Sequence, residues 1–240
     1  MLKNIVRSIL NYFHLDVTKN LHYDRLTKEI IKKALTSNSN TIDIGCHKGE
    51  ILCELYKQAP QGTHFGFEPI PVLYEKLKEE FKNKAQIFPY ALAETNGTTT
   101  FHYVKNAPAY SGIKKRKYNI EHPDIEKIEV TLKKLDDVIP PTTKINFIKI
   151  DVEGAELGVL KGAEQLLKRD KPIVIFECGL GASEYYNTQA KDVFDFLNLQ
   201  IGLKIYTLES WLSKNTSLSE NEFITCFNTN SEYYFIADTL

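Results

Sequence analysis

The sequence predicts an α/β fold in which helices cover both faces of a mostly parallel central sheet. Short apolar runs alternate with amphipathic segments along most of the 240 residues. The apolar runs are nearly continuous, which is typical of parallel strands buried on both faces. A third observation is a polar, Thr-rich interruption at about residues 96–135, which predicts a β-rich insertion.

The expected elements follow in chain order. Spacing of apolar residues predicts helices in five segments, namely 24–36, 49–59, 71–82, 155–169 and 189–200. Short apolar runs predict strands in seven segments, namely 40–45, 63–68, 85–92, 145–151, 172–177, 203–208 and 232–237. Prolines mark several boundaries, because Pro71 suits the first turn of a helix while Pro60 and Pro172 follow helix ends.

Composition restricts the class of protein. A net charge of −1 gives the chain no overall attraction for nucleic acid. No run approaches the roughly 20 apolar residues that a transmembrane helix needs. The four cysteines have neither CxxC pairing nor zinc-ligand spacing. Buried free thiols in a reducing compartment explain them best, so we expect a cytoplasmic protein.

Residues 1–37 form an expected N-terminal helical extension that precedes the main domain, residues 38–240. The first residues lack the apolar stretch and cleavage site of a signal peptide. Ile5, Ile9 and Phe13 instead follow helical spacing. Excess Lys and Arg could favour peripheral membrane contact by residues 1–15, but a helix packed on the main domain is the preferred interpretation.

Four acidic residues close or follow the apolar runs: Asp43, Glu68, Asp151 and Glu177. In a parallel sheet, such residues gather along the edge where ligands bind. Each acid taken singly could cap a helix or pair with a lysine. Together they favour a ligand rich in hydroxyl groups and positive charge, or a metal ion, because burying carboxylates without compensation is costly.

The stretch TIDIGCHKGE, residues 41–50, favours S-adenosylmethionine over a dinucleotide. A dinucleotide site requires three glycines around a pyrophosphate, whereas only Gly45 and Gly49 are present and Asp43 would repel that anion. S-adenosylmethionine has no phosphate and carries an ammonium and a sulfonium. Glu68 follows the next strand, at about the spacing expected of an acid that binds a ribose diol.

These stretches resemble the FkbM-type methyltransferase family. The matching segments are TIDIGCHKGE, GFEPIP, YALAETNGTTTFH, KLDDVI, NFIKIDVEGAELGVLKGAEQLL and PIVIFE, in order from about residue 40 to 178. The D-x-E-G-x-E arrangement that starts at Asp151 is the most specific of them. The resemblance implies a Rossmann-like class I methyltransferase fold that transfers methyl from S-adenosylmethionine to a hydroxyl of a saccharide or secondary metabolite. Cys46-His47-Lys48 departs from the family's usual Ala-Asn-x.

The resemblance also implies the cofactor contacts. The methionine-side loop would comprise Asp43, Gly45, Cys46 and Gly49. Glu68 would bind the ribose, and Pro69 and Ile70 would flank the adenosine. Ala91 and Leu92 would line the adenine, while Ser111 in the insertion could contact cofactor or acceptor, or only form a turn.

Methyl transfer to oxygen needs a base or a metal to remove the hydroxyl proton. Asp151 is the first candidate base, and Glu153 the second, with helix capping as its alternative role. His47 and His102 are reserve bases, since each is more often structural. Asp151 and Glu177 are also candidate ligands for a divalent cation such as Mg²⁺.

The basic run Lys114–Lys117 in the insertion suggests an anionic acceptor, although such runs are usually solvated faces. Two other functions remain open. A nicotinamide-dependent oxidoreductase is disfavoured by the missing third glycine. A catalytically inactive methyltransferase fold that serves as a binding or scaffold protein is disfavoured by the intact acids.

Overall fold

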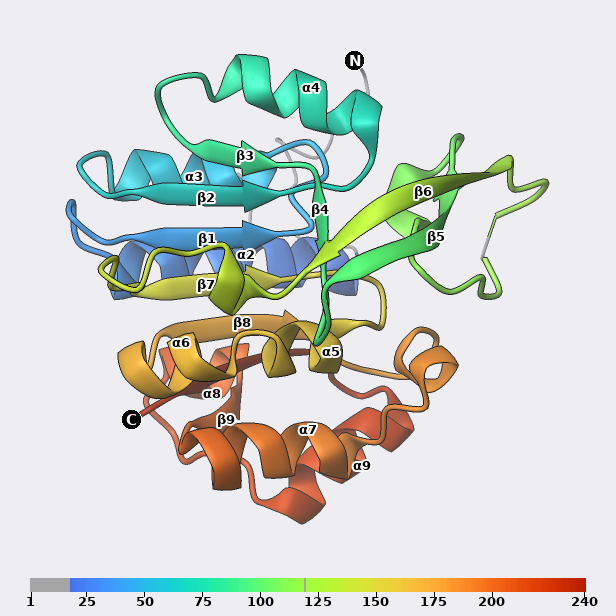
Figure 1. The fold of residues 1–240 in the computed structure, drawn as a ribbon. Coiled ribbons are helices and arrows are strands. Elements are labelled where there is room, and N and C mark those ends of the chain that lie inside the picture. The colour runs from blue at the N-terminus through green and yellow to red at the C-terminus, as the bar shows by residue number, and fades with distance from the viewer. Residues whose placement is uncertain (1–17, 119) are drawn as a thin grey trace.

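A computed structural model describes residues 18–118 and 120–240. Its main sheet has seven strands in the order β3-β2-β1-β7-β8-β10-β9, and only β10 runs antiparallel to its neighbours (Figure 1). The strands are β1 (Thr41–Ile44), β2 (His64–Phe67), β3 (Gln86–Phe88), β7 (Phe147–Ile150), β8 (Ile173–Glu177), β9 (Lys204–Thr207) and β10 (Tyr234–Asp238). The predicted α/β fold is confirmed. The helical segment expected around Ile5 to Phe13 lies outside the described residues.

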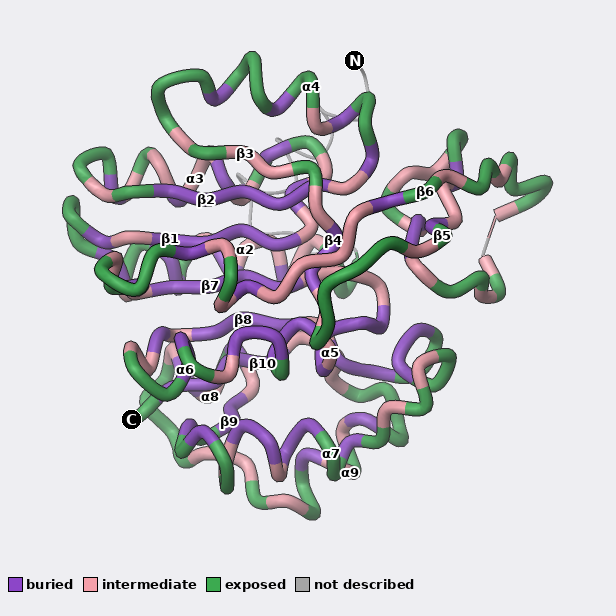
Figure 2. Tube along the Cα trace, viewed as in Figure 1, coloured by how far each residue is buried: buried purple, intermediate pink, exposed green. Residues whose placement is uncertain are grey.

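Helices cover both faces because successive strand residues point to opposite sides of the sheet. One face packs against α2 (Lys19–Ala34), α3 (Glu50–Gln58) and α8 (Leu208–Leu212). The other packs against α5 (Glu156–Lys161), α6 (Glu164–Asp170), α7 (Ala190–Phe194), the π-helical segment Asp195–Ile201 and α9 (Glu220–Thr229). The strands between them are buried almost throughout (Figure 2). Helix α4 (Pro71–Glu80) packs beside α3 next to the outer strand β3.

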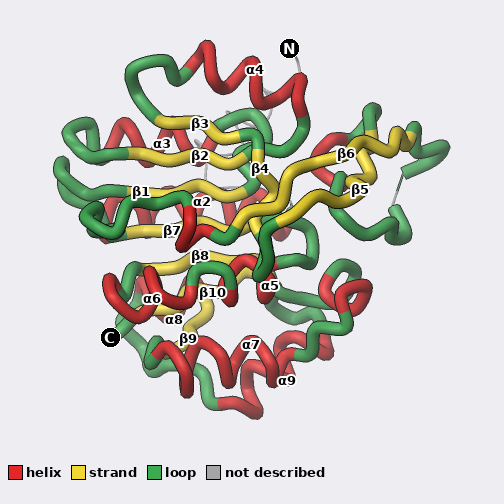
Figure 3. Tube along the Cα trace, viewed as in Figure 1, coloured by secondary structure: helices red, strands yellow, loops and turns green. Residues whose placement is uncertain are grey.

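The insertion forms a second, three-stranded sheet in the order β4-β6-β5 that projects from the main sheet (Figure 3). It contains β4 (Tyr90–Leu92), β5 (Gly97–Val104) and β6 (Ile125–Lys133). The single strand expected at 85–92 is therefore wrong: Pro89 separates β3 from β4, and β4 pairs with β6 instead of the main sheet. Proline has no N–H to donate to a sheet ladder, so the break falls there.

Two other expectations need correction. The helix expected at 155–169 is two helices, α5 and α6. The break falls at Gly162, where the chain turns and packs against the backbone of Ala93, the residue after β4. Helices α8 and α9 were not predicted, and both lie between the last two strands. Short helices in connections carry too little periodicity for a sequence pattern to identify them.

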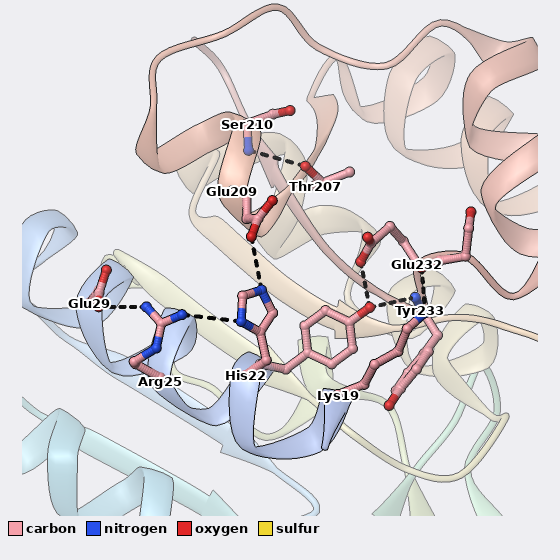
Figure 4. Close-up of polar contacts among 11 residues, drawn as sticks. Lys19, His22, Arg25, Glu29, Thr207, Glu209, Ser210, Glu232 and Tyr233 are labelled. Atoms are coloured by element: carbon pink, nitrogen blue, oxygen red, sulfur yellow. Dashed lines mark hydrogen bonds and ion pairs between the residues drawn. The ribbon is translucent and has the colours of Figure 1, made fainter. Parts of the chain in front are cut away.

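Helix α2 docks on the C-terminal part of the chain (Figure 4). Its residues Tyr23, Leu26 and Ile30 join a buried cluster with strand residues of the main sheet. On its polar side, His22 Nε2 lies 2.9 Å from Glu209 Oε1, and the Tyr23 hydroxyl donates to Glu232. Among the residues that the structure describes, no helix is both long and apolar enough to cross a membrane.

Candidate active site

A cavity of about 540 Å³ opens at the carboxyl ends of β1, β2, β7 and β8. The predicted residues that line it are Asp43, Gly45, Cys46, His47, Glu68, Pro69, Ile70, Ala91, Leu92, Ser111, Asp151, Glu153 and Glu177. Parallel strands place their following loops at one edge, so residues far apart in sequence meet there. Gly49 and His102 do not line the cavity.

The loop after β1 is shaped by glycines for close packing of the chain. Gly45 has φ +79°, and a Cβ there would lie 1.9 Å from the Asp151 carbonyl oxygen, so only glycine lets this loop meet the end of β7. Gly49 has φ +76°, and a Cβ there would lie 2.7 Å from Leu77 and Phe81. Gly49 thus makes room for α4. Cys46 is buried, and its thiol donates to the Asp43 carbonyl at 3.2 Å.

Asp43 carries a buried carboxylate, 1% exposed, in which neither oxygen has a hydrogen-bond partner among the described residues. The strand register places Asp43 opposite Lys149 of β7. Burial raises the pKa of Asp43, and the Lys149 ammonium opposes that shift. Unsatisfied buried carboxylates are rare in proteins, so this one is suited to a ligand that donates hydrogen bonds or carries positive charge.

Glu68 is also buried, and each of its oxygens accepts one backbone N–H. Oε2 accepts from His47 N at 2.8 Å and Oε1 accepts from Ile70 N at 2.9 Å. Burial raises the pKa of Glu68 to about 7 despite these bonds. Each carboxylate oxygen has a second lone pair, so the group can still accept from the two hydroxyls of a ribose.

The residues around Glu68 give the cavity an apolar end. Ala91 and Leu92 are buried on β4 and face the cavity with Pro69, Ile70 and Phe101. Ser111 is 6% exposed, and its hydroxyl accepts from Val104 N at 2.9 Å. Ser111 therefore stabilises the insertion at the wall of the cavity.

Asp151 is held by two neighbours at the end of β7. Its Oδ2 accepts from Lys149 Nζ at 3.0 Å and from the Tyr234 hydroxyl at 2.6 Å. Burial would raise the pKa of Asp151, but the Lys149 charge and the Tyr234 hydrogen bond lower it to about 2. Asp151 is thus ionised over the whole physiological range and is a weak base.

Glu153 lies two residues beyond Asp151, with φ +60°. A non-glycine residue in that region is strained, and such strain concentrates at functional sites. Its carboxylate pairs with Arg116 of the insertion. Burial and the nearby Asp151 raise the pKa of Glu153 to about 8, while Arg116 opposes the shift.

Glu177, at the end of β8, completes a group of three carboxylates. One oxygen from each of Asp151, Glu153 and Glu177 lies within 4.8 Å of the others. Burial and these neighbours raise the pKa of Glu177 well above its ordinary value. The two predicted metal ligands therefore lie together, and Glu153 joins them as a third oxygen donor.

His47 presents a ring nitrogen to the same region. Its Nε2 atom is buried and has no hydrogen-bond partner among the described residues. Burial and Lys48 lower the pKa of His47, so the ring is neutral at pH 7. By contrast, His102 lies in the insertion sheet, where its backbone bridges Gly112.

Sequence reasoning missed several residues of the site. Lys149 could have been found, because a charged residue inside an apolar strand requires a partner. Tyr234 lies in β10 and Tyr233 just before it, and no sequence pattern indicates that either residue belongs to the site. Asn20, Tyr23 and Thr27 show that α2 lines the cavity as well.

Comparisons with known proteins agree with this geometry. The methyltransferase FkbM domain family matches residues 43–204. Methyltransferase sdnD of Sordaria araneosa is 28% identical over 162 residues, which is 55% of this chain and 62% of that protein. The 2-O-methyltransferase NoeI of Sinorhizobium fredii is 25% identical over 144 residues, which is 54% of this chain and 59% of that protein. The matches cover less than two thirds of these relatives.

A solved structure shows the same fold. The methyltransferase FkbM from Methylobacillus flagellatus superimposes with a TM-score of 0.55 at 15% identity, covering 94% of this chain and 52% of that chain. The Rossmann-like methyltransferase fold expected from the sequence is confirmed.

Proposed function

Because this chain belongs to the FkbM methyltransferase family, we propose that it transfers a methyl group from S-adenosylmethionine to a hydroxyl oxygen of a saccharide or secondary metabolite. The observation that carries the proposal is the Asp43 carboxylate, which is buried without a partner in the cavity. A relative named a 2-O-methyltransferase supports oxygen as the acceptor atom. The free cysteines fit a cytoplasmic location.

The residues present fit S-adenosylmethionine. A cavity of about 540 Å³ has the size of a small-molecule site. Glu68 would accept from the ribose hydroxyls, and the apolar end formed by Ala91, Leu92 and Ile70 would hold the adenine. Asp43 and His47 supply unpartnered polar atoms for the methionine portion.

The bound cofactor supplies an electrophilic methyl group on a sulfonium. With the cofactor held by Asp43, Glu68 and the apolar end, the acceptor oxygen would receive that methyl group and its hydroxyl proton would pass to a base of this chain. Asp151 stays ionised and would orient the hydroxyl as a hydrogen-bond acceptor. Glu153 would take the proton, because its raised pKa suits a base near neutral pH.

A divalent cation is a second way to assist that step. Asp151, Glu153 and Glu177 offer oxygen donors at the spacing of one ion, which suits Mg²⁺ or Ca²⁺. Lys149 and Arg116 already balance part of this charge, so we propose the cation as an accessory. Activity that persists undiminished in a chelator excludes an essential metal, and Mg²⁺ titration followed by calorimetry tests binding directly.

The basic run would meet an anionic group on the acceptor. Arg116 is paired with Glu153, whereas Lys114, Lys115 and Lys117 are exposed. An acceptor phosphate or carboxylate would therefore lie at the protein surface, beside these three lysines. Changing the three lysines to serine should raise the acceptor KM and flatten its salt dependence, and unchanged kinetics would exclude this contact.

The first experiment is calorimetric titration of cofactor-free protein with S-adenosylmethionine, with NAD as a parallel titrant. We expect only the former to bind. Glu68→Gln should weaken binding about 10- to 100-fold, the range for losing charged hydrogen bonds. Glu94→Gln is the matched control, because Glu94 is exposed and outside the cavity. Binding of NAD alone would favour the oxidoreductase, and binding of neither would favour the scaffold.

A further inference from the structure

A second cavity of about 450 Å³ lies beside the first. Its walls come chiefly from the segment that follows β8, residues 178–185, and from Asn230 and Tyr233 before β10. No part of the proposed cofactor contact set enters it: Asp43, Glu68 and Ala91 line the first cavity only. The second cavity is therefore available to another molecule while the cofactor is bound.

The two cavities share one wall, made of Tyr110, Arg116, Glu177 and Tyr233. Arg116 forms its centre: the guanidinium pairs with Glu153 on one side and donates to the Gly181 carbonyl at 3.5 Å on the other. The central guanidinium carbon of Arg116, Cζ, lies 5.6 Å from the centre of the Tyr110 ring. A molecule in the second cavity would thus meet Glu177, one of the three grouped carboxylates.

The insertion holds this wall in place through two tyrosines of the residue 183–186 turn. The Tyr186 hydroxyl accepts from Lys114 N at 3.2 Å, and the Tyr185 hydroxyl accepts from Lys117 N at 3.1 Å. Arg116 stands between these two anchor points. Its side chain is therefore fixed where the cavities meet.

The lining of the second cavity combines exposed apolar side chains with buried polar ones. Leu180 and Tyr185 at the rim are 45% and 37% exposed, and they are two of only five large hydrophobic residues so exposed in the described part of the chain. The buried part of the lining is polar and includes Glu156 and Ser183, each 2% exposed. Exposed apolar side chains that gather at a cavity mouth indicate an apolar ligand group.

We propose that the second cavity binds the methyl acceptor, and that this acceptor is an amphiphilic alcohol. Its apolar group would cover Leu180 and Tyr185. Its reacting hydroxyl would lie at Glu177, which lines both cavities and has an oxygen within 4.8 Å of oxygens of Asp151 and Glu153. The assignment rests on the proposed methyltransferase function, since it gives the acceptor a place separate from the cofactor. It adds the chemical class of the acceptor and the residues that select it.

The test uses octyl β-D-glucopyranoside, below its micelle concentration, as a probe with an apolar chain and hydroxyl groups. It is titrated by calorimetry into the full chain saturated with S-adenosylhomocysteine. We expect saturable binding, and at least tenfold weaker binding of methyl β-D-glucopyranoside, which lacks the chain. Leu180→Asn should weaken binding of the octyl probe about fivefold, the size expected for losing part of a buried leucine contact.

Leu199→Asn is the matched control, because Leu199 is 70% exposed and lines neither cavity. Equal weakening by both variants, absence of saturable binding, or competition between the probe and S-adenosylhomocysteine would each overturn the proposal. Titration of S-adenosylmethionine into cofactor-free protein from the same preparation separates failure of the second cavity's assignment from failure of the proposed function. If the cofactor binds and the probe does not, only the second cavity's assignment fails; if the cofactor does not bind, the proposed function fails with it.

Discussion

Lys149 is the residue on which the charge balance of the site depends. Its side chain is 8% exposed, pairs with Asp151 at 3.0 Å and lies opposite Asp43 in the sheet register. The carboxylates around it raise the pKa of Lys149 although burial alone would lower it. Without this ammonium, Asp43 of β1 and Asp151, just after β7, would have no cation between them.

We therefore predict that Lys149→Met lowers the free energy of unfolding by about 3 kcal/mol at pH 8, the range for breaking a buried ion pair. The loss should be smaller at pH 5, because the freed carboxylates can then take up protons. Urea denaturation at both pH values measures the effect, with exposed Lys144→Met as control. A loss that is equal at the two pH values would show that packing, not charge, is the cause.

Glu156 gives a second prediction at the scale of one residue. It is 2% exposed, and its Oε1 accepts from Val152 N and Gly154 N at 3.0 and 3.2 Å. Burial raises the pKa of Glu156 to about 7. A carboxyl whose pKa is raised on folding holds its proton more tightly in the folded state, so its contribution to stability is full below about pH 4.5 and is lost as pH rises through 7.

Glu156→Gln should therefore change the melting temperature little at pH 5 and raise it relative to wild type at pH 8.5. Glutamine Oε1 can accept both N–H groups without carrying charge. Thermal melts at the two pH values test this, and Glu164→Gln, at a half-buried acid on α6, serves as control. A variant that is less stable than wild type at pH 8.5 would contradict the prediction.

At the scale of elements, one close approach fixes the insertion sheet on the main domain. A Cβ at Gly162 would lie 2.1 Å from the Ala93 carbonyl oxygen, just after β4. A Cβ at Gly158, one turn earlier in α5, would meet only Glu94 N at 3.9 Å. The contact at Gly162 thus joins the turn between α5 and α6 to the strand that lines the apolar end of the first cavity.

We predict that Gly162→Ala lowers the free energy of unfolding by about 1–3 kcal/mol, because backbone must shift to accept the methyl group. Gly158→Ala in the same region should raise it by about 0.5–1 kcal/mol through helix propensity. Chemical denaturation of both variants provides the comparison. If Gly162→Ala were as stable as Gly158→Ala, the approach to Ala93 would not constrain the fold.

Elements and their contacts differ in how well sequence predicts them. Strand ends such as Asp43 and Glu68 were predicted, because apolar runs and parallel topology place them without knowledge of side-chain packing. The pair of Tyr234 with Asp151 spans 83 positions, and that of Arg116 with Glu153 spans 37. Such partners depend on where β10 and the insertion dock, which a local pattern does not encode.

The two glycines of the stretch TIDIGCHKGE, residues 41–50, show the same limit. Their spacing correctly indicated a tight turn after β1, yet the reason lies in tertiary packing. Gly45 meets the backbone of Asp151, and Gly49 makes room for Leu77 and Phe81. Sequence alone assigns both glycines to the cofactor, because it does not show which neighbouring segment approaches them.

The whole molecule is built so that the N-terminal helix completes both the core and the cavity. Ile30 and Ile31 of α2 are 0% and 1% exposed, in one cluster with Phe147, Ile175 and Ile236 of the main sheet. The same helix lines the cavity through Asn20, Tyr23 and Thr27. A boundary at residue 37 would therefore divide a single hydrophobic cluster.

We predict that a chain of residues 38–240 loses cooperative thermal unfolding and binds a hydrophobic dye, because the part of β7, β8 and β10 that α2 covers is then exposed. A point variant tests the same idea in the full chain: Ile30→Ala should lower the free energy of unfolding by about 2–5 kcal/mol, as for large-to-small changes in a core. Lys32→Ala, on the exposed part of α2, is the matched control and should change it by less than about 0.5 kcal/mol. Calorimetry with S-adenosylmethionine adds a functional readout, since loss of α2 removes a wall of the cavity. If residues 38–240 unfold cooperatively near the wild-type temperature and bind the cofactor with wild-type affinity, then α2 is an accessory to a domain that folds without it.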